Sequence, residues 1–247
     1  MKKQILEMLP KYLIENEYFV SLFEKLINGV SNISVGKHRN GNYYFTSIQE
    51  PLMDNVSFSL FVSNKGISDV TMQKIECLNS NSGLLESKSN ILVSSIKTAT
   101  DGYSITSRHI ITTKDTENNS FEKRQFFEKR EYDSNGVLLN KQCNSYIPEE
   151  IDYDSYRNVS WDNDASLERA LSYVYSGDFA ISREYNRILG SNTYLPQHDE
   201  KRYIINYKDG KEIEKKEIDE EEYQEIYYDI AYKNKTKSNV KKLEKRF

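Results

Sequence analysis

The residues that could carry out chemistry are few, and they lie far apart along the chain. The three histidines are His38, His109 and His198, and the two cysteines are Cys77 and Cys143. Zinc centres draw several such ligands from neighbouring positions, and a nucleophilic thiol needs a basic or glycine-rich neighbourhood that lowers its pKa. Neither arrangement occurs here, so the sequence predicts no metal site and no catalytic cysteine.

Sequence motifs that mark catalytic sites are also absent. The chain contains no GxGxxG, no GxxxxGK[ST], no HExxH and no GxSxG. Each of these motifs reports a chemistry that needs close backbone approach or a fixed set of ligands. The sequence therefore favours a protein that is not an enzyme and that needs no cofactor.

Two pairs of aspartates in the middle of the chain could bind a hard cation through oxygen ligands. They are Asp152 with Asp154, and Asp162 with Asp164. The spacing does not fit an EF-hand, because the sixth loop position is not glycine and the twelfth is Asn163. We interpret the segment as a solvated acidic loop in which Asp164 caps a helix.

The same acidic loop holds three large aromatic side chains, Tyr153, Tyr156 and Trp161, set among the carboxylates of Asp152 and Asp154. Tyrosine and tryptophan are common anchors of protein interfaces, and surrounding acids steer a basic partner. These residues are the predicted partner-binding site. The alternative is that the aromatic rings pack inward and cover an edge of the sheet.

A basic tail at the C-terminus suggests a second kind of partner. Clustered lysines neutralise phosphates in a salt-dependent way, although the tail has a single aromatic, Phe247, on which a base could stack. The opposing interpretation is a solubilising tail that complements a helix dipole. The predicted nucleic-acid contacts are Lys37, Arg39, Lys235, Lys237, Lys241 and Lys242.

Hydrophobic periodicity places these residues on structural elements. Residues 4–28 have helical spacing, which Pro10 and the polar residues 15–17 divide into shorter helices. The period then changes to two, as in β-strands, and Asn40-Gly41 is a favoured hairpin turn. The expected strands, with turn signals between them, are 33–39, 42–48, 56–63, 69–78, 84–97, 103–114, 121–132 and 137–146.

After Pro148 the pattern indicates helices again. Apolar spacing predicts one helix from Asp164 to Gly177 and a second from Asp178 to Gly190, each with a cap and a closing glycine. A hairpin over 203–217 follows. A last helix starts at Asp219, where Asp219 with Glu222 fits a capping box and Ile218 with Tyr223 fits a hydrophobic staple.

The composition agrees with a folded, cytoplasmic chain. Hydrophobic residues make up 37% and charged residues 29% of its 247 residues, which supports a lean core, and the net charge of −4 gives no overall attraction to nucleic acid or an anionic membrane. Glu7, Pro10 and Lys11 interrupt the apolar residues near the start of the chain, which argues against a signal peptide. We expect reduced thiols and no membrane span.

Two short segments, 132–138 and 207–211, resemble the hairpin units of Rhs-type β-repeat proteins. The resemblance covers a few residues at each place and follows from turn chemistry. It implies hairpins and nothing about activity.

The sequence thus predicts an α+β fold, in which a central antiparallel meander carries an N-terminal helix and C-terminal helices packed on it. We expect one region over 1–148, a possible second lobe over 149–232 and a flexible basic tail over 233–247. The function predicted first is non-enzymatic binding of a protein partner, as in inhibitors, immunity proteins or accessory proteins. The alternatives are nucleic-acid binding and a small-molecule pocket in a curved sheet, with Tyr103 and His109 inside it. The oligomeric state stays open.

Overall fold

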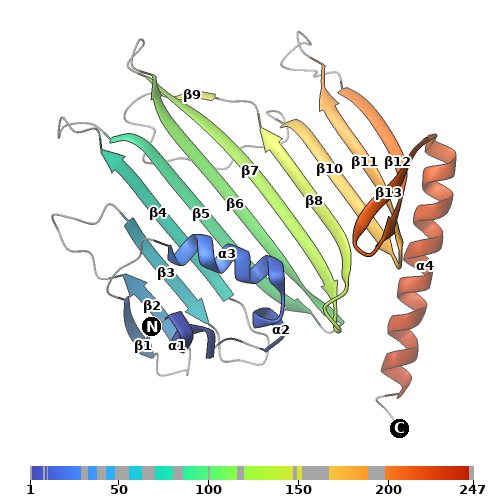
Figure 1. Ribbon diagram of the computed structural model, residues 1–247, viewed down its shortest axis with the longest axis horizontal. Helices are drawn as coiled ribbons and strands as arrows, with labels where there is room; N and C mark the ends of the chain where they lie inside the picture. Colours follow the sequence, from blue (N-terminus) through green and yellow to red (C-terminus); the bar gives the residue numbers. More distant parts are fainter. Residues whose placement is uncertain are drawn as a thin grey trace.

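The computed structural model describes residues 2–7, 9, 11–28, 33–37, 43–47, 56–62, 70–79, 86–99, 101–115, 120–146, 149–151, 167–188 and 198–244. Within these ranges the chain forms three short N-terminal helices, one sheet of thirteen strands and a long C-terminal helix (Figure 1). The predicted α+β class with an antiparallel meander is confirmed. No helix in the described part of the chain combines the length and the apolar character that a membrane span needs.

The strands follow one another in space in nearly the same order as in the sequence. Every neighbouring pair is antiparallel, and the path runs from β1 through β8 to β10 and on to β13, while the short β9 pairs with β7. The strands are β1 (Ile33–Lys37), β2 (Tyr43–Ser47), β3 (Val56–Val62), β4 (Val70–Asn79), β5 (Glu86–Ala99), β6 (Gly102–Asp115), β7 (Ser120–Asp133), β8 (Leu138–Tyr146), β9 (Glu149–Ile151), β10 (Leu167–Ser176), β11 (Phe179–Arg187), β12 (His198–Lys208) and β13 (Lys211–Ile218).

Turn chemistry sets the register where the turns are described. Between β7 and β8, the Asp133 carboxylate accepts hydrogen bonds from the backbone N–H groups of Asn135 and Val137, at 2.8 and 2.9 Å. Between β12 and β13, Asp209 and Gly210 both have positive φ, of 52° and 73°, as a tight two-residue hairpin turn requires. The hairpin expected over 203–217 is therefore confirmed.

The predicted helix pair over 164–190 is wrong. Its described residues form a β-hairpin, β10 and β11, and Gly177 lies in the turn with φ of 63°. The apolar spacing that suggested helices also fits strands rich in aromatic and β-branched residues. Hydrogen bonding decides between the two, because β10 pairs with β8 on one side and β11 pairs with β12 on the other.

This correction lengthens the meander beyond the eight strands expected over 33–146. Because β8 pairs with β10, the sheet runs across the expected boundary at residue 148. The division of the chain into domains stays a prediction.

The last helix, α4 (Glu220–Glu244), starts as predicted. The Asp219 carboxylate accepts a hydrogen bond from the backbone N–H of Glu222 at 2.9 Å, and Ile218 and Tyr223 share one buried cluster. The helix then continues through the segment expected to be a flexible tail, to Glu244. Lysine, glutamate and leucine favour helix, and no glycine or proline follows Gly210 to stop it.

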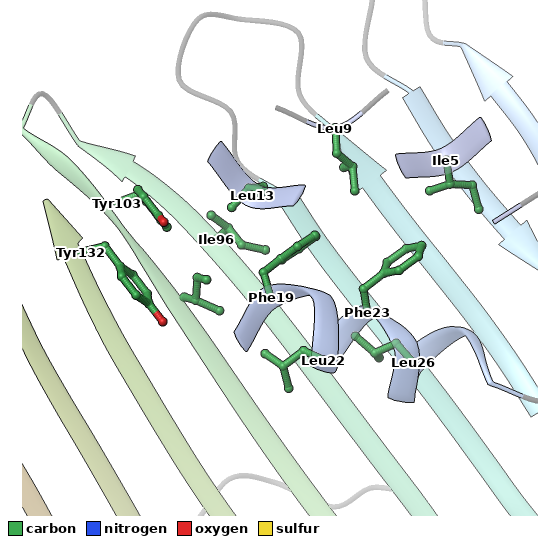
Figure 2. Packing of buried hydrophobic residues seen from close by; sticks show 11 residues of the cluster. Ile5, Leu9, Leu13, Phe19, Leu22, Phe23, Leu26, Ile96, Tyr103 and Tyr132 are labelled. Carbon is green, nitrogen blue, oxygen red and sulfur yellow. The ribbon is translucent and has the colours of Figure 1, made fainter. Parts of the chain in front are cut away.

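The N-terminal helices are α1 (Lys2–Glu7), α2 (Lys11–Ile14) and α3 (Glu17–Ile27). They lie across one face of the sheet and bury an apolar cluster against it (Figure 2). Ile96, Tyr103 and Ile105 come from β5 and β6, and Tyr132 comes from β7. The helical members of the cluster are Ile5, Leu9, Leu13, Phe19, Leu22, Phe23 and Leu26.

Helix α4 packs on the opposite face of the sheet, beside β10 to β12. Its buried cluster includes Ile181, Tyr223 and Ile230, with Val174 and Ile204 packed against it. The strand registers show which face of the sheet this cluster occupies. Ile204, Ile181 and Val174 lie opposite one another on neighbouring strands, and the same row continues through Asn140 and Glu131 to Ser104 on β6. Ser104 alternates with Tyr103, which faces the N-terminal helices.

Asn16 joins the helices to the sheet. As the N-cap of α3, its side-chain carbonyl accepts a hydrogen bond from the backbone N–H of Phe19 at 3.0 Å, and its amide donates to the Tyr103 hydroxyl at 3.0 Å. Both groups are buried. One side chain therefore satisfies a helix end and a buried phenol at once.

We expect Asn16→Ala to lower the free energy of unfolding by about 2–3 kcal/mol, since it removes a cap and leaves the Tyr103 hydroxyl without its partner. Denaturant titration measures this loss. Asn135→Ala, in the exposed turn between β7 and β8, serves as the control and should cost under about 0.5 kcal/mol. Equal effects of the two substitutions would contradict the assignment. A double-mutant cycle with Tyr103→Phe isolates the coupling.

Candidate functional site

A cleft of about 730 Å³ lies between α3 and the face of the sheet that the N-terminal helices cover in part. Helix α3 forms one wall, and β6, β7, β8 and β10 form the floor. Its residues are Tyr18, Leu22, Lys25, Ser107, His109, Phe126, Phe127, Glu128, Cys143, Asn144, Ser145, Arg169 and Leu171. The cleft thus brings together segments that are far apart in the sequence.

The helical wall follows from the spacing of its side chains. Tyr18, Leu22 and Lys25 recur at the helical period and share one side of α3. Tyr18 attaches this side of the helix to the sheet. Its hydroxyl is 3.0 Å from the Ser107 hydroxyl, and its ring centroid is 3.6 Å from the guanidinium carbon of Arg130. Burial raises the pKa of the Tyr18 hydroxyl, so the wall presents a neutral phenol at physiological pH.

The strand registers build the floor. Phe126 lies opposite His109 on one side and opposite Ser145 on the other. Cys143 likewise lies opposite Glu128 on β7 and opposite Leu171 on β10. Residues opposite one another in a sheet point to the same face, so these side chains form two adjacent rows.

The charges that line the cleft do not cancel. Glu128 accepts a hydrogen bond from the Nε of Arg130 at 2.7 Å, and the Nζ of Lys141 lies 3.9 Å from the same carboxylate. Lys25 and Arg169 are exposed, and within the described part of the chain no ion pair engages either of them. The cleft therefore has two cationic side chains available and one carboxylate that is already neutralised.

Cys143 is a thiol rather than a thiolate. Partial burial raises its pKa, and the neighbouring Glu128 carboxylate raises it further. A thiolate is the reactive form of cysteine, so the position suits packing against a ligand rather than nucleophilic attack. Among the described residues, no three His, Cys, Asp or Glu side chains come together as metal ligands.

A tyrosine cluster, Tyr173, Tyr175, Tyr203 and Tyr207, continues this face beyond the cleft. The ring centroids of Tyr173 and Tyr175 are 6.1 Å apart, and those of Tyr175 and Tyr207 are 6.2 Å apart. Burial raises the pKa of Tyr173, Tyr175 and Tyr207, so their hydroxyls stay protonated. Ala180 and Ser182, small and fully buried, lie in the rows opposite these rings.

The structure separates the two residues expected inside a ligand pocket. His109 lines the cleft, with its ring centroid 6.2 Å from that of Phe126. Tyr103 does not line the cleft, although both residues lie on β6. It is packed in the core between Tyr12 and Tyr132, at centroid distances of 4.7 and 5.0 Å.

Most of the other predicted site residues lie outside the described part. The interface residues Tyr153, Tyr156, Trp161, Asp152 and Asp154 belong to this group, as do Arg39, His38, Asp162 and Asp164. Lys37 ends β1, Cys77 is in β4, and Lys235, Lys237, Lys241 and Lys242 are in α4. His198, at the start of β12, stacks on Tyr185 with centroids 4.1 Å apart.

Sequence reasoning missed much of the cleft. The apolar spacing predicts a helix at Leu171, and over 4–28 it marks only the apolar side of the helix that carries Lys25. The spacing of Tyr18, Leu22 and Lys25 could have shown that a second side of α3 is amphipathic. No local signal could have shown that this side meets β8 and β10.

Comparison of the chain with protein families, with curated proteins and with solved structures finds no match.

The raised pKa of Cys143 predicts a pH-rate profile. With Cys77→Ser as the background, alkylation of Cys143 by iodoacetamide should reach half its maximal rate at a higher pH in the folded protein than in the unfolded protein. Burial holds the thiol protonated, and Glu128→Gln should shift the folded midpoint downward, because it removes a negative charge. Coinciding midpoints for the folded and unfolded protein would contradict this account.

Proposed function

We propose that this chain is a non-enzymatic binding protein whose cleft between α3 and the sheet holds a small-molecule ligand. The observation that carries the proposal is the cleft itself. Its volume of about 730 Å³ is within the range of about 300–1,000 Å³ typical of small-molecule sites. Apolar side chains mixed with a few polar groups are also typical of such sites.

The states of Glu128, Tyr18 and Cys143 support binding rather than catalysis. A general base or nucleophile needs a free lone pair and a suitable pKa. Glu128 is held by Arg130, Tyr18 is bonded to Ser107, and the Cys143 thiol is neutral. The proposal includes a cytoplasmic location, with which a free cysteine in the cleft agrees.

Filling the cleft tests the proposal. The neutral dye Nile red, which fluoresces in apolar surroundings, should bind the wild-type protein. Leu171→Trp should weaken the binding about tenfold or more, because the indole occupies the floor. Fluorescence titration measures the affinity, and circular dichroism checks that the variant is folded.

The matched control is Val137→Trp, which adds the same indole at a turn residue that is 56% exposed and outside the cleft. This variant should bind the dye as the wild type does. Dye binding that is absent from the wild type, or that survives Leu171→Trp unchanged, would contradict the cleft as a ligand site.

A second candidate function, recognition of a protein partner, is favoured by exposed tyrosines on α4. Tyr228 and Tyr232 are 67% and 73% exposed, and they lie one helical turn apart. Tyrosines are enriched among the residues that dominate interface energies. The predicted acidic aromatic loop over 152–161 stays a further prediction for the same function.

Replacing both tyrosines tests this second candidate. If α4 is the interface, the double substitution Tyr228→Ser and Tyr232→Ser should lower the affinity for a stoichiometric protein partner by about 30-fold or more. Pull-down with quantitative mass spectrometry identifies the partner, and titration then measures its affinity. Ile213→Ser, on the exposed edge strand β13, is the control. Equal binding by the double variant and wild type would exclude α4 as the interface.

A further inference from the structure

The cleft has an asymmetric arrangement of charge and apolar surface. Arg169 and Leu171 are two residues apart on β10, so both point to the same face of the sheet, about 7 Å apart along the strand. Ser145 lies opposite Arg169, and Cys143 lies opposite Leu171. On β8 and β10 the floor is therefore cationic and polar in one row and apolar in the next.

Two further apolar side chains line the cleft outside the row of Leu171 and Cys143: Phe126 lies in the row of Ser145 and Arg169, diagonal to Cys143. Leu22 comes from the helical wall, and Phe126 comes from β7 and is 42% exposed. Covering an exposed phenylalanine with an apolar group stabilises the complex by about 25 cal/mol for each Å² of apolar surface removed from water. The surface available here suits the body of a small apolar molecule.

The cationic part has no partner within the described chain. Arg169 and Lys25 are exposed, whereas Glu128 is already bound by Arg130. A guanidinium forms paired hydrogen bonds with a carboxylate, and the Ser145 hydroxyl beside it can donate one more. Because Arg169 is exposed, the bound anion would keep part of its hydration, which limits its desolvation cost.

From this arrangement we infer that the cleft binds a small amphipathic carboxylate. The carboxylate lies at Arg169, Lys25 adds to the positive field, and the apolar body lies along Leu171, Cys143, Leu22 and Phe126. This inference rests on the proposed ligand-binding function and names the class of ligand. It predicts that a negative charge on the ligand raises affinity.

Displacement of Nile red by two matched molecules tests the inference. Decanoate and 1-decanol have the same chain length and differ in charge. The titration uses the full chain with Cys77→Ser. We expect decanoate to displace the dye at a concentration about tenfold lower than decanol does, and to slow alkylation of Cys143.

Charge-removing variants locate the carboxylate. Arg169→Gln should abolish most of the tenfold preference, and Lys25→Gln should reduce it less. Lys11→Gln, which removes an equal charge from an exposed ion pair with Glu15 outside the cleft, should leave the preference unchanged. Decanol displacement should be similar in all three variants, since they keep the apolar lining.

The outcomes separate the inference from the proposed function. If the dye binds and decanoate and decanol displace it equally, the inference of a carboxylate ligand is wrong, while the proposed ligand-binding function is retained. A decanoate preference that persists in Arg169→Gln overturns the assignment of the head group. Absence of both dye binding and Cys143 protection overturns the ligand cleft, and the inference with it.

Discussion

A sheet one layer thick has two faces, and each apolar row on either face needs a cover. The chain meets this requirement with two separate sets of helices. The N-terminal helices cover one face over β5 to β7, and α4 covers the opposite face over β10 to β12. Each cover removes the apolar side chains beneath it from water.

The cleft is a consequence of where the N-terminal cover stops. Helix α3 buries Phe19, Phe23 and Leu26 on one side, while its next side faces the open floor. Two side chains hold the helix in this position: Asn16 contacts Tyr103, and Tyr18 contacts Ser107 and Arg130. Beyond the cleft, the tyrosine cluster provides its own cover, since its long side chains surround the small residues Ala180 and Ser182.

The sequence predicts the strands well because period two and turn residues are local signals. Its failure over 164–190 has a physical cause: the spacing of Leu167, Leu171 and Val174 fits a helix, and only pairing with β8 and β12 shows that these residues are in strands. The cleft depends on similar distant contacts. Tyr18 meets Ser107, 89 residues away, and no local pattern encodes that meeting.

The proposed ligand site lies on the part of this face that α3 leaves uncovered. The rows that hold Cys143 and Leu171 lie on paired strands of the sheet. The acidic group of the floor, Glu128, is used to hold Arg130, whose guanidinium in turn packs on the Tyr18 ring. That chain of contacts links the floor of the cleft to its helical wall. Lys25 and Arg169, which no ion pair engages within the described part of the chain, are exposed in the cleft and are the basis of the proposed anion contact.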